Sequence, residues 1–408
     1  MYTHTTLPLP SGTIVHNWKP SGPSPPRAIL ILQHGFGEYA ERYATSHSKF
    51  IPRLTEWGIE VWALDLQGHG LSPGVRGVVD IHAAVRDHVW LVGFVAAGAG
   101  ASVETTAVPG STPDRPGSKI SIPPIILFGH SLGGLVTAGS ATAILTASQK
   151  LNNSNATPFP TPRINGVLLT SPVLPFPNPN TGQILISTLA SLLLRLIAFF
   201  FPNREVPTLP GSTSPPSDTL RGENEAVQMA ADDEMLFRGG ISWTAAASAV
   251  GVVIGVWRGI REGLWGRQEE DEAGNDNRVH VKVDVDVNVL ILHGRWDPWS
   301  DRRGSLSFVE GIQRSRTQIA RPKRAKTGKT DGESEDERSR ARLVILDTPY
   351  HELLNAGGST GEEVFRVILE WIDARIADGY ASPNSGVDCE PRGCGAINAP
   401  SVYAPRHG

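Results

Sequence analysis

Short apolar runs recur along this chain with turn residues on both sides, and longer helical patterns lie between them. Runs rich in Val, Ile and Leu, without polar alternation, are typical of strands buried on both faces of a parallel sheet. We expect strands near residues 13–18, 28–33, 59–65, 125–129, 166–170, 287–292 and 342–347. Helical spacing of apolar residues occurs near 40–56, 80–97, 132–147, 301–313 and 361–376. Because strand and helix alternate, the pattern predicts a three-layer α/β domain with a mostly parallel central sheet flanked by helices.

Three segments interrupt this alternation. Residues 98–121 are rich in Gly, Ser, Pro and Thr, which indicates a surface insertion. Residues 314–341 mix Lys, Arg, Asp and Glu without an apolar face, which is typical of a solvated, mobile loop. Residues 172–278 contain helical runs but no strand that continues the sheet, so we expect an inserted helical cap. The expected division is therefore core 1–171, cap 172–278, core 279–378 and a disordered tail 379–408.

Composition and charge exclude several classes of protein. The net charge of the 408 residues is -4, with both signs spread along the chain, so no basic surface for a nucleic acid is expected. The two cysteines, Cys389 and Cys394, both lie in the tail, which excludes a disulfide framework or a four-cysteine metal site. No metal, nucleotide or flavin pattern occurs, and we expect no cofactor. The first residues lack the positive start and apolar run of a secretory signal, so a cytoplasmic location is expected.

The pattern GxSxG, which can place a serine on a sharp strand-to-helix turn, occurs three times, at 70–74, 129–133 and 357–361. In the first, Ser72 is followed by Pro73, which has no backbone N–H to stabilise an oxyanion. In the third, Ser359 or Thr360 precedes a helical pattern and is better explained as a helix N-cap. Neither context suits a nucleophile.

The second occurrence has the context that nucleophilic catalysis needs. GHSLGG follows the apolar run IPPIILF and precedes a helical pattern, which predicts a strand, a tight turn and a helix with Ser131 at the turn. The N–H of Leu132 can then face the reacting carbonyl oxygen. A second oxyanion donor is expected from the loop after an early strand, where HGFG presents the N–H of Phe36. We expect Phe36 and Leu132 to form the oxyanion hole.

A serine hydroxyl needs an imidazole to take its proton and a carboxylate to orient that imidazole. In hydrolases with this turn the partners follow the serine in the order acid, then histidine. The downstream histidines are His280, His293, His351 and His407. His280 and His293 precede the expected acid and His407 lies in the tail, which leaves His351, just beyond the strand RLVILD, as the base.

The acid should lie in the loop after the preceding strand. VNVLILHGRWDPWSD supplies Asp297 there, with Asp301 as the second choice. Asp347 precedes His351 by only four residues, although a loop turn could bring the two together. We expect Ser131, Asp297 and His351 to form a catalytic triad.

With these pieces in order, the chain resembles the monoacylglycerol lipase and lysophospholipase group of α/β-hydrolases, which is also described as serine aminopeptidase-like. The matching stretches are HGFGEYAERY, ALDLQGHGLSPGVRG, FGHSLGG, ADDEMLFRGG, LHGRWDPWSD and YHELLN. The spacing of Glu38 and Arg42, and Tyr350 before His351, Glu352 and Leu353, are not demanded by the fold in general. The resemblance implies the triad and oxyanion hole named above, a helical cap, and hydrolysis of a monoacylglycerol or lysophospholipid through an acyl-enzyme on Ser131.

Residues 184–201 are apolar except for small polar residues and Arg195, and they reach the minimum length of a membrane span. A span would place Arg195 in hydrocarbon and pull the segment out of the domain. A buried cap helix and an interfacial helix, with Arg195 reaching for lipid headgroups, are the other interpretations. Because similar proteins have an apolar cap helix that touches lipid, peripheral contact with membranes or lipid droplets is our hypothesis.

Two alternatives stay open beside a lipid esterase. Triad chemistry serves esters and amides alike, so the chain could be a general carboxylesterase or a serine aminopeptidase. A hydrolase-fold protein that only binds a ligand or partner is the alternative of another class, and it would have no need of a nucleophile, base and acid together.

Overall fold

The computed structural model describes residues 1–104, 123–152, 162–174, 181–207, 229–265, 287–319 and 340–380. Most of the expected insertion 98–121, most of the charged loop 314–341 and nearly all of the tail 379–408 lie outside these residues. The starts of the expected insertion and of the charged loop differ from the expectation. Residues 98–104 and 314–319 each continue a helix and do not begin a loop.

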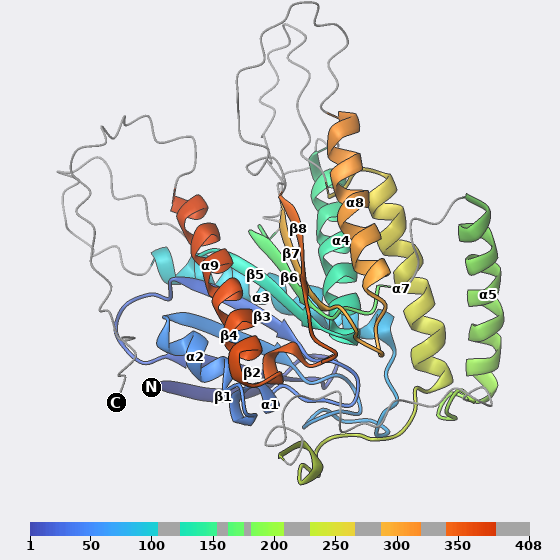
Figure 1. The fold of residues 1–408 in the computed structure, drawn as a ribbon, viewed down its shortest axis with the longest axis horizontal. Helices are drawn as coiled ribbons and strands as arrows, with labels where there is room; N and C mark the ends of the chain where they lie inside the picture. Colours follow the sequence, from blue (N-terminus) through green and yellow to red (C-terminus); the bar gives the residue numbers. More distant parts are fainter. Residues whose placement is uncertain are drawn as a thin grey trace, which may run out of the picture.

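An eight-stranded sheet forms the centre of the molecule, in the order β1-β2-β4-β3-β5-β6-β7-β8 (Figure 1). Its strands are β1 (Tyr2–Pro8), β2 (Ile14–Pro20), β3 (Ala28–Gln33), β4 (Ile59–Leu64), β5 (Ile125–His130), β6 (Gly166–Thr170), β7 (Asn288–Gly294) and β8 (Ala341–Leu346). From β4 to β8 along the sheet every neighbouring pair is parallel, and β2 is antiparallel to both β1 and β4. The mostly parallel sheet is confirmed, and β1 is an edge strand that the sequence did not predict.

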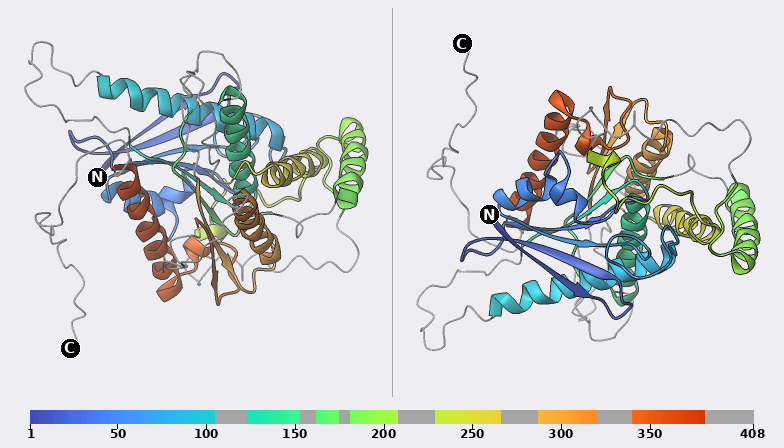
Figure 2. Two further views of the ribbon diagram at one scale, coloured as in Figure 1. Left: turned by 90° about the horizontal axis from the view of Figure 1, so that it is seen from above. Right: turned by 90° about the horizontal axis from the view of Figure 1, so that it is seen from below.

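Helices cover both faces of this sheet (Figure 2). They are α1 (Arg42–Thr45), α2 (Phe50–Glu56), α3 (Ile81–Glu104), α4 (Leu132–Asn152), α5 (Thr181–Phe200), α7 (Trp243–Arg261), α8 (Arg302–Ile319), α9 (Gly358–Tyr380) and the 3-10 helix η1 (Leu353–Asn355). The expected helix over 40–56 is instead the two short helices α1 and α2.

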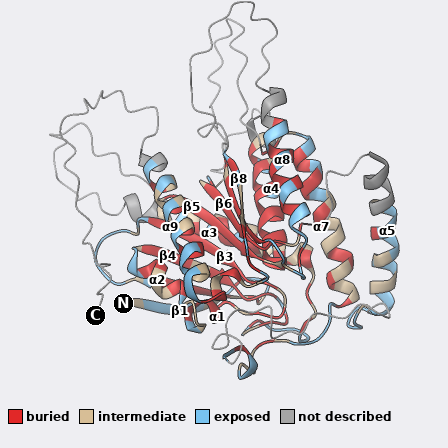
Figure 3. Ribbon diagram, in the orientation of Figure 1, coloured by how far each residue is buried: buried red, intermediate tan, exposed pale blue. Residues whose placement is uncertain are grey.

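Alternation along the strands divides the core into two parts. Ile29 and Ile31 of β3 pack in the cluster that includes residues of α3, α4, α7 and α8. Leu30 and Leu32 pack in the other cluster, with residues of α1, α2 and α9. Because successive side chains of a strand point to opposite faces, the unbroken apolar runs supply both cores at once. Figure 3 shows the central strands buried throughout.

Between β6 and β7 the described residues form the helices α5 and α7 and no strand of the sheet. The side chain of Ser242 caps α7 by accepting the N–H of Ala245 at 3.2 Å, and α7 packs against α3, α4 and α8. By length and composition α7 is the one described helix that could cross a membrane, but half of its apolar window is buried in the core. Helix α5 packs on α7 and stands farther from the sheet (Figures 1 and 2).

Candidate active site

Ser131 occupies the sharp turn between β5 and α4. Its φ angle is +52°, in the left-handed region that a non-glycine residue rarely adopts. The glycines on either side make the turn feasible, because a Cβ on Gly129 would lie 2.6 Å from the carbonyl oxygen of Gly133. A Cβ on Gly133 would lie 2.3 Å from the carbonyl oxygen of Gln33. The sequence GHSLGG therefore folds here as the strand, turn and helix that we expected, with the serine hydroxyl at the carboxyl end of the central strand.

The other two GxSxG serines have structural positions. Ser72 is buried, donates its hydroxyl to the Asp65 carbonyl at 2.7 Å and accepts the N–H of Ile14 at 2.8 Å. It therefore ties its loop to β2. Ser359 and Thr360 lie in the first turn of α9, which begins at Gly358, so they are inside the helix rather than at its cap.

His351 joins the serine to a carboxylate. Its Nε2 lies 2.8 Å from Ser131 Oγ and its Nδ1 lies 2.8 Å from Asp297 Oδ2. The histidine follows β8, and the aspartate follows β7, at the edge of the sheet where β5 ends. The structure thus brings together all three residues of the expected triad across more than 200 positions of sequence.

The carboxylate of Asp297 is held from both sides. Its Oδ1 accepts the backbone N–H groups of Trp299 at 2.8 Å and Ser300 at 3.2 Å. Its Oδ2 accepts the Ser300 hydroxyl at 2.7 Å beside the His351 hydrogen bond. Burial alone would raise the pKa of Asp297, but hydrogen bonds from His293, His351 and Ser300 outweigh it and hold this pKa far below its usual range. The carboxylate is therefore ionised and fixed in orientation.

The two other aspartates considered for this position lie elsewhere. Asp301 is exposed and pairs with Arg303. Asp347 is also exposed, and it pairs with Arg295 at 3.0 Å and accepts the indole N–H of Trp296 at 3.2 Å. Neither contacts the imidazole in a described interaction.

His293 was rejected as a base, yet it lies beside the acid. It is buried, and its Nε2 is 3.4 Å from Asp297 Oδ2 and 3.0 Å from the Ser300 carbonyl oxygen. Both neighbours are acceptors, so Nε2 carries a hydrogen, and Nδ1 faces the Ser305 hydroxyl at 2.8 Å. Sequence reasoning missed this role, although the four-residue spacing to Asp297 across a strand end could have indicated it.

The loop after β3 contains Phe36, whose N–H we expected as an oxyanion donor. His34 Nδ1 lies 2.7 Å from the Gly35 carbonyl oxygen, while its Nε2 accepts the N–H of Leu66 at 2.9 Å. His34 therefore donates from Nδ1 and holds this carbonyl in place. In a trans peptide the next N–H points the opposite way, so the N–H of Phe36 is directed away from His34. No described residue accepts a hydrogen bond from the N–H of Phe36 or Leu132.

The segment between β6 and β7 contacts this loop through the ADDEMLFRGG stretch. The N–H of Phe237 donates to the Gly37 carbonyl at 2.8 Å, and the Tyr39 hydroxyl donates to Asp233 at 2.9 Å. The rings of Phe36 and Phe237 meet edge to face at 5.7 Å. The half-exposed indole of Trp299 lies 6.2 Å from the His351 ring. Aromatic side chains therefore lie on the loop that contains Phe36 and next to the imidazole of His351.

Comparisons with known proteins agree with this architecture. Residues 24–325 match the family model described as "Serine aminopeptidase, S33". The monoglyceride lipase of Homo sapiens is 25% identical over 90% of this chain and 88% of that protein, and the monoglyceride lipase of Mus musculus is 29% identical over 92% and 89%. The crystal structure of Paleococcus ferrophilus monoacylglycerol lipase superposes with a TM-score of 0.52 at 20% identity, over 92% of this chain and 99% of that one. The α/β-hydrolase fold is thereby confirmed, and the chain belongs to the serine aminopeptidase S33 family.

Proposed function

We propose that this protein is a serine hydrolase that cleaves carboxylic esters of lipids, with monoacylglycerol as the favoured substrate and lysophospholipid as the alternative. The observation that carries the proposal is the continuous hydrogen-bonded chain from Ser131 through His351 to the buried side chain of Asp297. We assign Ser131 as nucleophile, His351 as general base and Asp297 as the acid that orients the imidazole. Phe36 and Leu132 are the proposed oxyanion donors.

In acylation, Ser131 Oγ attacks the ester carbonyl carbon and its proton moves to His351 Nε2. The carbonyl oxygen becomes an oxyanion, which the N–H groups of Phe36 and Leu132 stabilise. When this intermediate collapses, the bond to the alcohol oxygen breaks, and the imidazolium returns its proton to that oxygen. The alcohol leaves and the acyl group remains on Ser131.

In deacylation, water replaces the alcohol. His351 Nε2 takes a proton from the water as its oxygen attacks the acyl carbon, and the same two N–H groups hold the second oxyanion. Collapse breaks the bond to Oγ, and the proton passes from the imidazolium to Ser131. One ester and one water thus give one fatty acid and one alcohol, with no cofactor.

The relatives support the substrate class, since those compared above are named monoglyceride or monoacylglycerol lipases. A panel of monoacylglycerol, lysophospholipid, a short soluble ester and an aminoacyl amide tests the assignment. We expect the highest kcat/KM on monoacylglycerol. The highest value on the aminoacyl amide would instead identify a peptidase, and no turnover of any substrate together with no Ser131 labelling by a fluorophosphonate would identify a binding protein.

An outward apolar stripe on α5 supports peripheral contact with lipid. Side chains spaced for one helical face are 57–79% exposed: Leu189, Leu192, Leu193, Leu196, Phe199 and Phe200. Arg195 does not reach outward as we expected, because its Nη2 lies 3.1 Å from His82 Nε2 and faces α7 near Gly251. We propose a cytoplasmic enzyme that lays this stripe on a membrane or lipid droplet, with Arg195 fixing α5 to the body.

Charged substitutions on the stripe test this contact. Leu192→Glu with Leu196→Glu should lower hydrolysis of vesicle-borne monoacylglycerol about tenfold or more, because each leucine loses its transfer into lipid. Hydrolysis of a short soluble ester should stay within about twofold of the unmodified protein. Leu306→Glu, on the half-exposed Leu306 of α8, is the matched control. Equal losses on both substrates would refute the lipid contact.

A further inference from the structure

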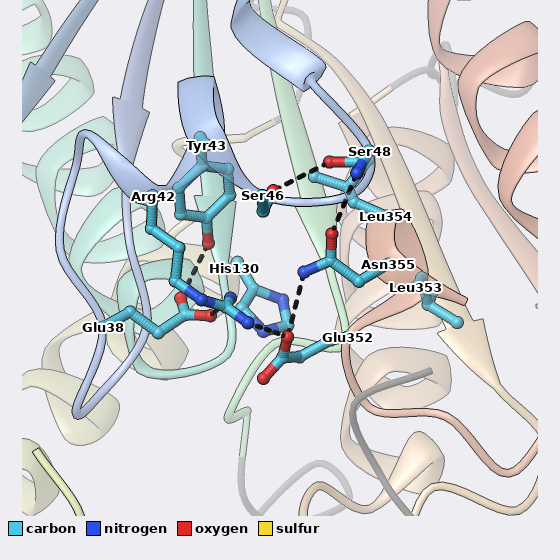
Figure 4. A pocket seen from close by; sticks show the side chains of 10 residues that line it. All are labelled: Glu38, Arg42, Tyr43, Ser46, Ser48, His130, Glu352, Leu353, Leu354 and Asn355. Atoms are coloured by element: carbon cyan, nitrogen blue, oxygen red, sulfur yellow. Dashed lines mark hydrogen bonds and ion pairs between the residues drawn. The ribbon is translucent and has the colours of Figure 1, made fainter. Parts of the chain in front are cut away.

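A buried ionic cluster of Glu38, Arg42 and Glu352 lies beside the site. The spacing of these residues was noted above as a feature that the α/β-hydrolase fold does not demand in general. Arg42 Nη1 donates to Glu38 Oε1 at 2.8 Å and its Nη2 donates to Glu352 Oε2 at 2.7 Å (Figure 4). We call Glu38, Arg42 and Glu352 the Arg42 clamp. The Tyr43 hydroxyl adds a 2.8 Å bond to Glu38, and the Asn355 amide adds a 3.0 Å bond to Glu352.

Each end of the Arg42 clamp reaches one part of the proposed catalytic machinery. Glu38 Oε2 accepts the N–H of Gly35 at 2.8 Å, one residue before Phe36. At the other end Glu352 directly follows His351 and precedes η1. One guanidinium therefore joins the loop that contains the proposed oxyanion donor Phe36 to the loop that contains the proposed base, although 310 positions separate Arg42 from Glu352.

The nucleophile lies between these loops. A Cβ built on Gly35 would approach Ser131 Cβ to 3.1 Å and His130 Cδ2 to 3.2 Å, so the oxyanion loop packs directly on the turn. The His130 ring in turn lies 5.0 Å from the His351 ring. A shift of either loop therefore changes the distances on which proton transfer and oxyanion binding depend.

Stability does not require such a cluster. Side-chain exposure is 7% for Arg42, 8% for Glu38 and 12% for Glu352, so three charges are held almost out of water. Burial alone would raise the pKa of Glu38, but attraction to His130 and Arg42 and hydrogen bonds from Tyr43 and Gly35 lower it to about 2. Well-packed apolar side chains often replace buried ion pairs without loss of stability. What directed ionic bonds supply, and apolar packing does not, is a fixed geometry between two loops.

We propose that Arg42, bonded to both Glu38 and Glu352, is a positioning residue for the hydrolysis, which holds the oxyanion loop and the base loop in register around Ser131. The inference rests on the proposed function, since it assumes that these loops carry the oxyanion donor and the base. The clamp acts through geometry and not through contact with the acyl group. Its loss therefore lowers kcat and leaves KM for a short ester nearly unchanged.

Two substitutions and a matched control test the clamp. In Arg42→Lys the ammonium keeps the buried charge but cannot bridge two carboxylates in the fork geometry of a guanidinium. Glu352→Gln keeps an acceptor oxygen for Arg42, and Glu352→Ala removes it. The control is Glu362→Gln. Like the clamp, Arg53 and Glu362 form an arginine–glutamate pair between distant segments, with two bonds of 3.0 and 2.7 Å that join α2 to α9, but this pair lies on the exposed surface.

The readouts are kcat and KM on p-nitrophenyl butyrate, the rate constant for fluorophosphonate labelling of Ser131, and Tm. We expect kcat and the labelling rate to fall about 10- to 100-fold in Arg42→Lys and Glu352→Ala, as displacements of about 1 Å can cause. KM should stay within about threefold, Glu352→Gln should recover most of the loss, and Glu362→Gln should behave as the unmodified protein.

Unchanged kcat in folded Arg42→Lys would overturn the proposal. A rise in KM with kcat unchanged, or losses that follow Tm alone, would also overturn it. Labelling needs no lipid, so a protein that is labelled but does not hydrolyse monoacylglycerol would contradict the proposed substrate while the clamp is still tested. Failure to label the unmodified protein would contradict both.

Discussion

Replacing Asp297 with asparagine should nearly abolish turnover without disturbing the fold around it. The two oxygens of Asp297 have different partners: Oδ1 accepts the backbone N–H groups of Trp299 and Ser300, and Oδ2 accepts the Ser300 hydroxyl and His351 Nδ1–H. The backbone donors at Oδ1 cannot turn away, whereas the Ser300 hydroxyl can donate to the Ser171 carbonyl at 3.0 Å and His293 Nε2–H to the Ser300 carbonyl at 3.0 Å. An asparagine therefore keeps its single oxygen at the Oδ1 position. Its NH₂ group then lies at the Oδ2 position and faces the imidazole.

That arrangement favours the wrong tautomer of His351. An NH₂ donor stabilises an unprotonated Nδ1, so the hydrogen moves to Nε2, which can then no longer take the proton of Ser131. In a serine protease the same exchange lowers kcat about 10⁴-fold, equivalent to about 5 kcal/mol of transition-state stabilisation. We expect a loss of that order for Asp297→Asn.

The assay is kcat/KM on p-nitrophenyl butyrate for Asp297→Asn beside Asp301→Asn and Asp347→Asn, with circular dichroism to verify folding. The two controls change exposed aspartates in the same region and should retain activity within about twofold. The assignment of the acid would be wrong if Asp297→Asn kept more than about a tenth of the activity of the unmodified protein. It would also be wrong if Asp301→Asn lost more activity than Asp297→Asn.

Two further predictions concern packing and pH. His88 is buried, has no hydrogen-bond partner among the described residues, and has its pKa lowered by burial from 6.5 to about 4. The unfolded state therefore binds the extra proton, and the His88 contribution to stability falls as pH falls from 6.5 towards 4. Urea unfolding measures the free energy of unfolding of His88→Leu minus that of the unmodified protein. This difference should be about 2 kcal/mol larger at pH 5 than at pH 7.5. The same difference at both pH values would contradict this reasoning. Gly35→Ala adds a methyl group 3.1 Å from Ser131 Cβ and should lower kcat about tenfold or more. The control is Gly361→Ala, whose methyl group would lie 3.7 Å from its nearest neighbour and should leave kcat unchanged. Equal activity of the two variants would show that the loop containing Gly35 tolerates displacement.

Local patterns were sufficient to predict the elements that carry the site. The apolar runs of β3, β5 and β7 are buried on both faces, and β8 is an apolar run that is only partly buried, so each is visible as a strand without knowledge of its neighbours. Because parallel strands end at the same edge, the residues that follow them could be expected to meet there. The order serine, acid, histidine then limited the choice to a few candidates.

The parts that sequence reasoning missed depend on contacts rather than on local pattern. Strand β1 is mostly exposed and rich in threonine, so it has no apolar run to indicate it. The direction of Arg195 depends on where His82 lies, and the contact of Arg42 with Glu352 depends on how two loops fold together. His293 contacts the acid only because the loop after β7 turns back on its own strand.

Peptide mapping after fluorophosphonate labelling tests the central claim most directly. The unmodified protein should gain one phosphonyl group, located on the peptide that contains Ser131, and labelling should be lost in Ser131→Ala and strongly slowed in His351→Ala. An adduct on Ser72 or Ser359, or labelling that persists in folded Ser131→Ala, would contradict the proposed active site.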